Sequence, residues 1–92
     1  MIRSFADRDA RALFEGRRVH RFEAIREQAE RRLQVLASAR TLDDLRALRS
    51  NRLEALSGDR AGQFSIRINR QWRICFIWRD GDTWDVAIVD YH

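Results

Sequence analysis

The spacing of apolar side chains changes once along this 92-residue chain, and the change strongly constrains the fold. Up to about residue 62, apolar residues recur every three to four positions, which is the period of an amphipathic helix. From about residue 63 they recur every second position, as in a strand with one buried face. The sequence therefore predicts an α+β fold, in which N-terminal helices pack on one face of a small, mainly antiparallel sheet.

The helical half carries one apolar stripe and two signals for helix starts. The stripe consists of Phe22, Ile25, Ala29, Leu33 and Leu36. Ser4 with Asp7, and Thr41 with Asp44, match the capping box, in which a hydroxyl and a carboxylate satisfy free amides at a helix N-terminus. We expect helices to begin near residues 5 and 42 and a third to lie between them.

Three strands are predicted in the second half, with Asp80 and Gly81 forming the last turn. Their apolar positions are Phe64, Ile66 and Ile68, then Trp72, Ile74, Phe76 and Trp78, then Trp84, Val86 and Ile88. These side chains, including all three tryptophans, should share one face of an antiparallel meander. The N-terminal helices are the candidates to cover it.

The register of the first hairpin follows from keeping apolar residues on one face. A three-residue loop, 69–71, pairs Ile66 with Ile74, and the same register sets Arg67 opposite Arg73 on the other face. Like charges directly opposite each other destabilise a sheet by up to about 1 kcal/mol. Two explanations stay open: both guanidinium groups splay into water, or an anion bridges them.

The register of the second hairpin brings the C-terminus to the same face. Pairing Trp78 with Trp84, Phe76 with Val86 and Ile74 with Ile88 sets Tyr91 beside Gln71. Tyr91 should then stand near Arg67 and Arg73, with His92 just beyond it, while Asp90 projects to the other face. The sequence predicts a functional site here.

Composition limits the chemistry of that site. All 18 basic residues are Arg and the net charge is +4, which suits a phosphate-bearing partner. Cys75 is the single cysteine, so neither a disulfide framework nor a thiolate metal cage can form, and we expect a buried thiol and no cofactor. Paired arginines, an imidazole and a phenol suit metal-independent cleavage of RNA through its own 2'-hydroxyl.

The length fits a single domain spanning residues 1–92. The N-terminus lacks the apolar run of a signal peptide, and no stretch reaches the 18 or more apolar residues of a membrane span. We therefore expect a cytoplasmic protein without a membrane partner.

Several segments together resemble a known family. NRLEALSGDRAGQFSIRINRQWRICF, VDYH at the C-terminus and the MIRSF start are similar to HigB-type killer toxins of the RelE/ParE superfamily. The resemblance implies a toxin of a type II toxin-antitoxin system that cleaves mRNA on the ribosome. It also implies a HigA-type helix-turn-helix antitoxin as partner, with operator DNA bound only through that antitoxin.

The same resemblance assigns site residues and shows two departures. It implies a catalytic set made up of Arg67 and Arg73, as phosphate-contacting arginines, and of Asp90, Tyr91 and His92, as the C-terminal catalytic tail. Arg52, Arg60 and Arg70 are candidate substrate-binding residues. Many members read LHPLKGD where this chain reads LEALSGD, so Glu54 and Ser57 replace a His and a Lys, which affects catalysis or substrate choice. The alternatives are a toxin of the same fold that inhibits gyrase or ribosome assembly without cutting RNA, and a partner-binding subunit without toxicity.

Overall fold

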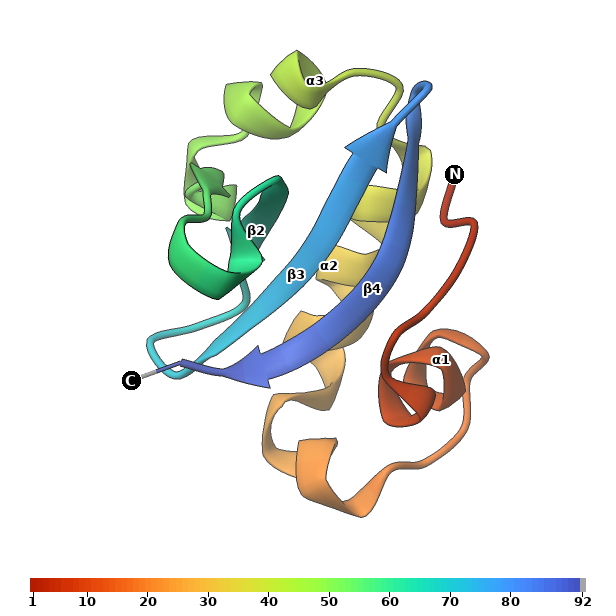
Figure 1. Cartoon of the computed structure of the whole chain (residues 1–92). Coiled ribbons are helices and arrows are strands. Elements are labelled where there is room, and N and C mark those ends of the chain that lie inside the picture. The colour runs from red at the N-terminus through yellow and green to blue at the C-terminus, as the bar shows by residue number, and fades with distance from the viewer. Residues whose placement is uncertain (92) are drawn as a thin grey trace.

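Apart from the two-residue strand Glu54–Ala55, the helices lie before residue 63 and the strands from it onward, as the change of period predicts (Figure 1). The computed structural model describes residues 1–91. The helical elements are α1 (Arg8–Phe14), η1 (His20–Ile25), α2 (Arg26–Ser38), α3 (Leu42–Ala47), η2 (Arg49–Asn51) and η3 (Gly58–Arg60), where η marks a 3-10 helix. The strands are β1 (Glu54–Ala55), β2 (Gln63–Arg67), β3 (Trp72–Arg79) and β4 (Asp82–Asp90).

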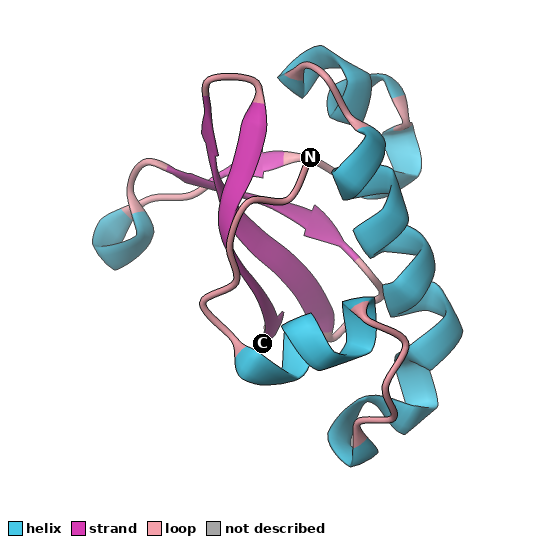
Figure 2. Cartoon of the chain, turned by 90° about the vertical axis from the view of Figure 1, so that its right-hand side faces the viewer, coloured by secondary structure: helices cyan, strands magenta, loops and turns pink. Residues whose placement is uncertain are grey.

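The sheet has the order β1-β2-β3-β4, and every neighbouring pair is antiparallel. Figure 2 shows the sheet edge-on, with the main helices on one side of it. The α+β prediction is confirmed, although the sequence pattern missed β1. Within residues 1–91, no helix has the length and apolar composition needed to cross a membrane.

The core lies between α2 and the sheet. All five residues of the predicted stripe are buried, although Phe22 and Ile25 belong to η1 and the α-helix begins only at Arg26. Phe22 meets Trp72 of β3 edge-on, with ring centroids 5.5 Å apart. Cys75 is also buried, as expected, and this burial raises the pKa of its thiol.

The predicted register holds throughout the first hairpin and in part of the second. Ile66 pairs with Ile74 and Arg67 with Arg73, and on the other side Ile74 pairs with Ile88. The prediction that Trp78 pairs with Trp84 is wrong. Cys75 pairs with Ala87, but beyond that point Ile77 pairs with Trp84 and Trp78 with Thr83.

A β-bulge causes this difference. Between the pairs Cys75–Ala87 and Ile77–Trp84, β4 places two residues, Asp85 and Val86, opposite Phe76 of β3. The extra residue turns Trp84 over to the face that carries Ile77. The prediction that all three tryptophans share the apolar face is therefore wrong for Trp84, and the buried Thr83 lies opposite Trp78 instead.

The N-terminus stabilises the bulge. Asp85 has φ +53°, and its backbone amide donates to Ser4 Oγ over 2.8 Å while Ser4 Oγ donates to the Asp85 carboxylate. Ser4 is therefore not a helix cap, and the predicted helix start near residue 5 is wrong. The first helix begins at Arg8, with Asp7 as its N-cap.

The second capping box is confirmed and predicts a pH effect. Thr41 Oγ1 accepts from the amide of Asp44, and the Asp44 carboxylate accepts from the amides of Arg40 and Thr41. These two backbone hydrogen bonds lower the pKa of Asp44. A lowered folded-state pKa gives stability that is present above the unfolded value, near 3.9, and is lost as pH falls through the folded value.

We therefore expect Asp44→Asn to flatten the fall in unfolding free energy below about pH 4. Urea unfolding of wild type and variant between pH 2.5 and 7 measures this dependence. Asp43→Asn is the matched control, because Asp43 is the neighbouring exposed carboxylate and does not belong to the capping box. Parallel pH curves for wild type and Asp44→Asn would contradict the expectation.

Candidate active site

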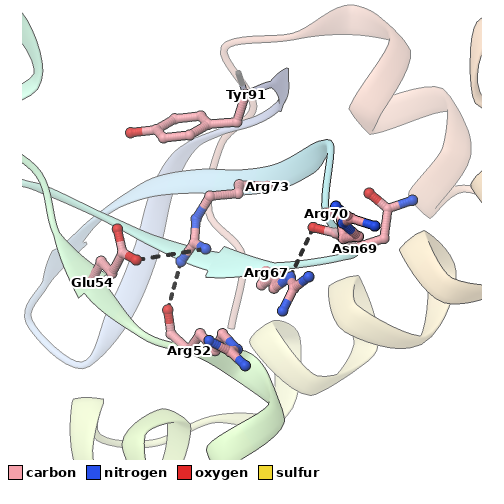
Figure 3. A pocket seen from close by; sticks show the side chains of 7 residues that line it. All are labelled: Arg52, Glu54, Arg67, Asn69, Arg70, Arg73 and Tyr91. Atoms are coloured by element: carbon pink, nitrogen blue, oxygen red, sulfur yellow. Dashed lines mark hydrogen bonds and ion pairs between the residues drawn. The ribbon is translucent and has the colours of Figure 1, made fainter.

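An open pocket of about 330 Å³ lies where the first hairpin, the segment before β2 and the C-terminal end of β4 meet (Figure 3). Its lining residues are Arg52, Glu54, Arg67, Asn69, Arg70, Arg73 and Tyr91. Four of these seven are arginines, so the pocket is strongly cationic. Glu54 and Tyr91 add a carboxylate and a phenol, which are groups that can accept or donate a proton.

Arg73 is the buried member of the set, with 7% of its surface exposed. Its Nε donates to Ser65 Oγ over 2.7 Å, and its Nη2 donates to the carbonyl of Arg52 over 2.5 Å. Nη1 stands 3.8 Å from Glu54 Oε1. Protein atoms therefore surround most of this guanidinium group.

Arg67 is held by the loop of the first hairpin. Its Nε donates to the carbonyl of Asn69 over 3.0 Å. The Asn69 side chain in turn accepts from the amides of Gln71 and Trp72, both over 2.8 Å. This Asx-turn fixes the loop that carries Arg70.

The opposed arginines avoid each other by turning to different acceptors. Figure 3 shows Arg73 directed toward Glu54 and the Arg52 carbonyl, whereas the hydrogen bond of Arg67 leads to Asn69. Of the two explanations left open by the sequence, splaying of both groups into water is wrong for Arg73, because this side chain is buried, and a bridging anion stays a hypothesis. Each guanidinium group instead has protein oxygen atoms near it, which reduces the repulsion expected of a like-charged pair.

Tyr91 reaches the pocket as the register predicts. Its amide donates to the carbonyl of Gln71 over 2.5 Å, which extends the β3–β4 pairing past the end of β4. Its ring lies against the guanidinium group of Arg73, with the Arg73 Cζ atom 5.9 Å from the ring centroid. With 39% of its surface exposed, Tyr91 remains accessible from solvent.

The structure brings five of the eight predicted site residues to this pocket, namely Arg52, Arg67, Arg70, Arg73 and Tyr91. Two other predicted site residues among those described do not line the pocket. Arg60 donates to Gln63 Oε1, and Asp90 accepts from Gln71 Nε2. His92 lies outside the described residues.

Sequence reasoning did not assign Asn69 to the site, and it treated Glu54 only as a departure from the family pattern. The signal for Asn69 was its place in a three-residue hairpin loop, where Asn side chains commonly accept backbone amides.

A sequence model of a protein family, described as the RelE-like toxin of the type II toxin-antitoxin system HigB, matches residues 3–92. The fold and the cationic pocket therefore belong to a RelE-like toxin, a class of protein that is paired with an antitoxin. Toxin HigB-1 of Vibrio cholerae serotype O1 is 36% identical over 83 residues, covering 88% of this chain and 87% of that protein. Endoribonuclease HigB of Proteus vulgaris is 32% identical over 97 residues, covering the full length of both. The chain belongs to the HigB-like toxin family.

Proposed function

We propose that this toxin is an endoribonuclease that cleaves mRNA on the ribosome and thereby stops translation. The observation that carries the proposal is the pocket in which four arginines surround a carboxylate and a phenol. Arginine suits phosphate recognition because its planar group presents several donors and stays charged. The name of the Proteus vulgaris relative, Endoribonuclease HigB, supports the same activity.

The reaction needs one proton acceptor, one proton donor and cations. The 2'-hydroxyl of the RNA loses its proton to the acceptor, and its oxygen forms a bond to the adjacent phosphorus. The bond from phosphorus to the 5'-oxygen breaks, and the donor gives that oxygen a proton. The products are a 2',3'-cyclic phosphate and a 5'-hydroxyl, and the cations stabilise the charge that develops on the phosphate in between.

The described residues of the pocket fill these roles as follows. Glu54 accepts the proton of the 2'-hydroxyl, because its carboxylate is 55% exposed and stands at the pocket wall. Tyr91 donates toward the leaving oxygen. Arg67 and the exposed Arg70 hold the phosphate. His92, the residue after Tyr91, is proposed as a further proton carrier, with Asp90 orienting this C-terminal segment.

The partners follow from the same proposal. We infer a HigA-type antitoxin with a helix-turn-helix domain, through which the pair binds operator DNA. The substrate, mRNA on the ribosome, places the protein in the cytoplasm.

The test is induced expression of wild type and of His92→Ala in cells, with mRNA 5' ends mapped by sequencing within minutes. We expect new ends inside translated regions for wild type and a loss of at least 10²-fold in the variant, the usual contribution of a proton-transfer group. His20→Ala is the matched control, because His20 is the other of the two histidines of the chain and lies exposed at the start of η1.

Growth arrest without new mRNA ends would contradict the nuclease proposal. Such a result would indicate a toxin that binds gyrase or interferes with ribosome assembly. Full cleavage by His92→Ala would remove His92 from the mechanism and leave proton transfer to Glu54 and Tyr91.

A further inference from the structure

The hydrogen bonds of Arg73 account for most of its donors. A guanidinium group has five N–H donors, one on Nε and two on each terminal nitrogen. Nε donates to Ser65 Oγ over 2.7 Å, and Nη2 donates to the carbonyl of Arg52 over 2.5 Å and to that of Ser65 over 3.4 Å. The remaining nitrogen, Nη1, faces the Glu54 carboxylate at 3.8 Å. A phosphate approaching Nη1 would therefore meet a negative charge.

These contacts cross the sheet. Arg73 belongs to β3 and reaches past Ser65 of β2 to the segment Arg52–Glu54 at the start of β1. The strand β1 has two residues, and its pairing with β2 sets Glu54 opposite Ser65. So short a strand has few ladder hydrogen bonds of its own to fix its position.

The segment that Arg73 holds needs such support. Arg52 has φ +44°, a left-handed conformation that costs a non-glycine residue free energy unless its surroundings hold it. Its carbonyl accepts the hydrogen bond from Arg73 Nη2. Directly before it, the buried Asn51 accepts from Arg32 Nη1 and donates to the carbonyl of Leu45. Asn51 is thus held by Arg32 of α2, and Arg52 is held by Arg73 of β3.

Arg67 and Arg70 have a different environment. Arg67 is half-buried, and its Nε donates a hydrogen bond to the Asn69 carbonyl, while Arg70 is exposed in the hairpin loop. Both line the pocket beside Asn69. Among the described interactions, neither guanidinium group is paired with a carboxylate, so a phosphate can approach them without competition from an acid.

We propose that Arg73 is a positioning residue rather than a phosphate ligand: held by Ser65, it fixes the Arg52–Glu54 segment so that Glu54 faces the substrate, while Arg67 and Arg70 bind the phosphate. This division rests on the proposed nuclease function for its effect on rate. It assigns a role to Ser65, which is fully buried and does not line the pocket. It also predicts that lysine cannot replace Arg73, since a lysine ammonium cannot reproduce the planar set of donors.

The experiment compares Arg67→Gln, Arg73→Gln and Ser65→Ala. The first two make the same change at opposed residues, and Ser65→Ala keeps all four pocket arginines but removes the acceptor of Arg73 Nε. Arg79→Gln is the control, because Arg79 lies on the same strand and stacks on Trp84. Circular dichroism establishes that each variant is folded at the assay temperature.

Two quantities are measured for each variant. The first is the affinity for a single-stranded 12-mer of 2'-O-methyl RNA, which the proposed reaction cannot cut, at several salt concentrations. Each phosphate contact on single-stranded nucleic acid contributes about 0.7 to the slope of log affinity against log salt. The second is the single-turnover rate of mRNA cleavage on programmed ribosomes.

We expect Arg67→Gln to reduce the salt slope by about 0.7. Arg73→Gln and Ser65→Ala should leave the slope unchanged and lower the cleavage rate at saturation at least 10-fold. A role in folding alone would leave the rate of the folded variants unchanged, which would overturn the proposal. A slope reduced by about 0.7 in Arg73→Gln would make Arg73 a phosphate ligand and would also overturn it.

Failure of the proposed function gives a different result. If wild type binds the 12-mer but does not cut mRNA on ribosomes, the nuclease proposal is wrong. The salt slopes still decide between Arg67 and Arg73 as the phosphate ligand. If Arg73→Gln does not fold, the cleavage rate of Ser65→Ala tests the positioning role of Arg73, because this variant retains every charge of the site.

Discussion

Replacing Phe76 with alanine should lower the free energy of unfolding by about 3–5 kcal/mol. Phe76 is fully buried, belongs to the core and stacks on Phe64 with ring centroids 6.2 Å apart. It also lies opposite the bulge residues Asp85 and Val86 of β4, of which Val86 is itself fully buried in the core. Truncation removes apolar contacts and leaves a cavity that the twisted sheet cannot close completely. Urea unfolding followed by tryptophan fluorescence measures the loss.

The loss is large compared with the total stability of about 5–15 kcal/mol that is usual for small domains. Phe76→Leu keeps most of the apolar volume, so it should cost clearly less and remain measurable if the alanine variant is unfolded. Leu48→Ala is the control, because Leu48 is 45% exposed and should change stability by no more than about 0.5 kcal/mol. A cost below about 1.5 kcal/mol for Phe76→Ala would show that the bulge region repacks.

Alternation of side chains was sufficient to predict the first hairpin. With period 2 and a three-residue loop, the register that keeps Phe64, Ile66 and Ile68 on the face of Ile74 and Phe76 opposes Arg67 and Arg73. The prediction depends on local residues and a short loop. For the same reason, the placement of Tyr91 near Arg73 followed from counting along β4 from the Ile74–Ile88 pair.

The bulge could not be predicted because its cause is distant in sequence. One extra residue in β4 leaves an amide outside the ladder, and Ser4 accepts it from the other end of the chain. The N-terminal segment runs parallel to β4 through the bridges Ile2–Thr83 and Phe5–Val86. In a regular hairpin without a bulge, the positions of Trp78 and Trp84 would also place both side chains on the apolar face. The sequence pattern therefore gave no sign that the register shifts.

The part of the site that the sequence did not predict comes from β1. Its two residues, Glu54 and Ala55, are too few to show a period, and their position depends on Arg73 and on pairing with Ser65. Local propensity carries no information about such contacts, because they form only when the sheet is assembled. Hence the opposition of Arg67 and Arg73 was predicted, but the oxygen acceptor to which each guanidinium group turns was not.

The phenol of Tyr91 provides the second large effect. Tyr91→Phe should lower the single-turnover rate of mRNA cleavage by about 10²-fold or more, because the variant keeps the ring over Arg73 but loses the O–H that donates to the leaving oxygen. Binding of the 2'-O-methyl 12-mer should change less than twofold. Ribosome-programmed cleavage and fluorescence anisotropy measure the two quantities on the same preparations.

Tyr91→Ala separates proton transfer from packing, because it removes the ring as well as the hydroxyl. If the phenol transfers a proton, the Phe and Ala variants lose similar amounts of activity, since both lack the same O–H. If the ring serves only to shield the guanidinium group of Arg73 from solvent, Tyr91→Phe keeps wild-type activity and only Tyr91→Ala loses it. In that case the proton for the leaving oxygen has to come from His92 or from water, and the phenol has no part in the chemical step.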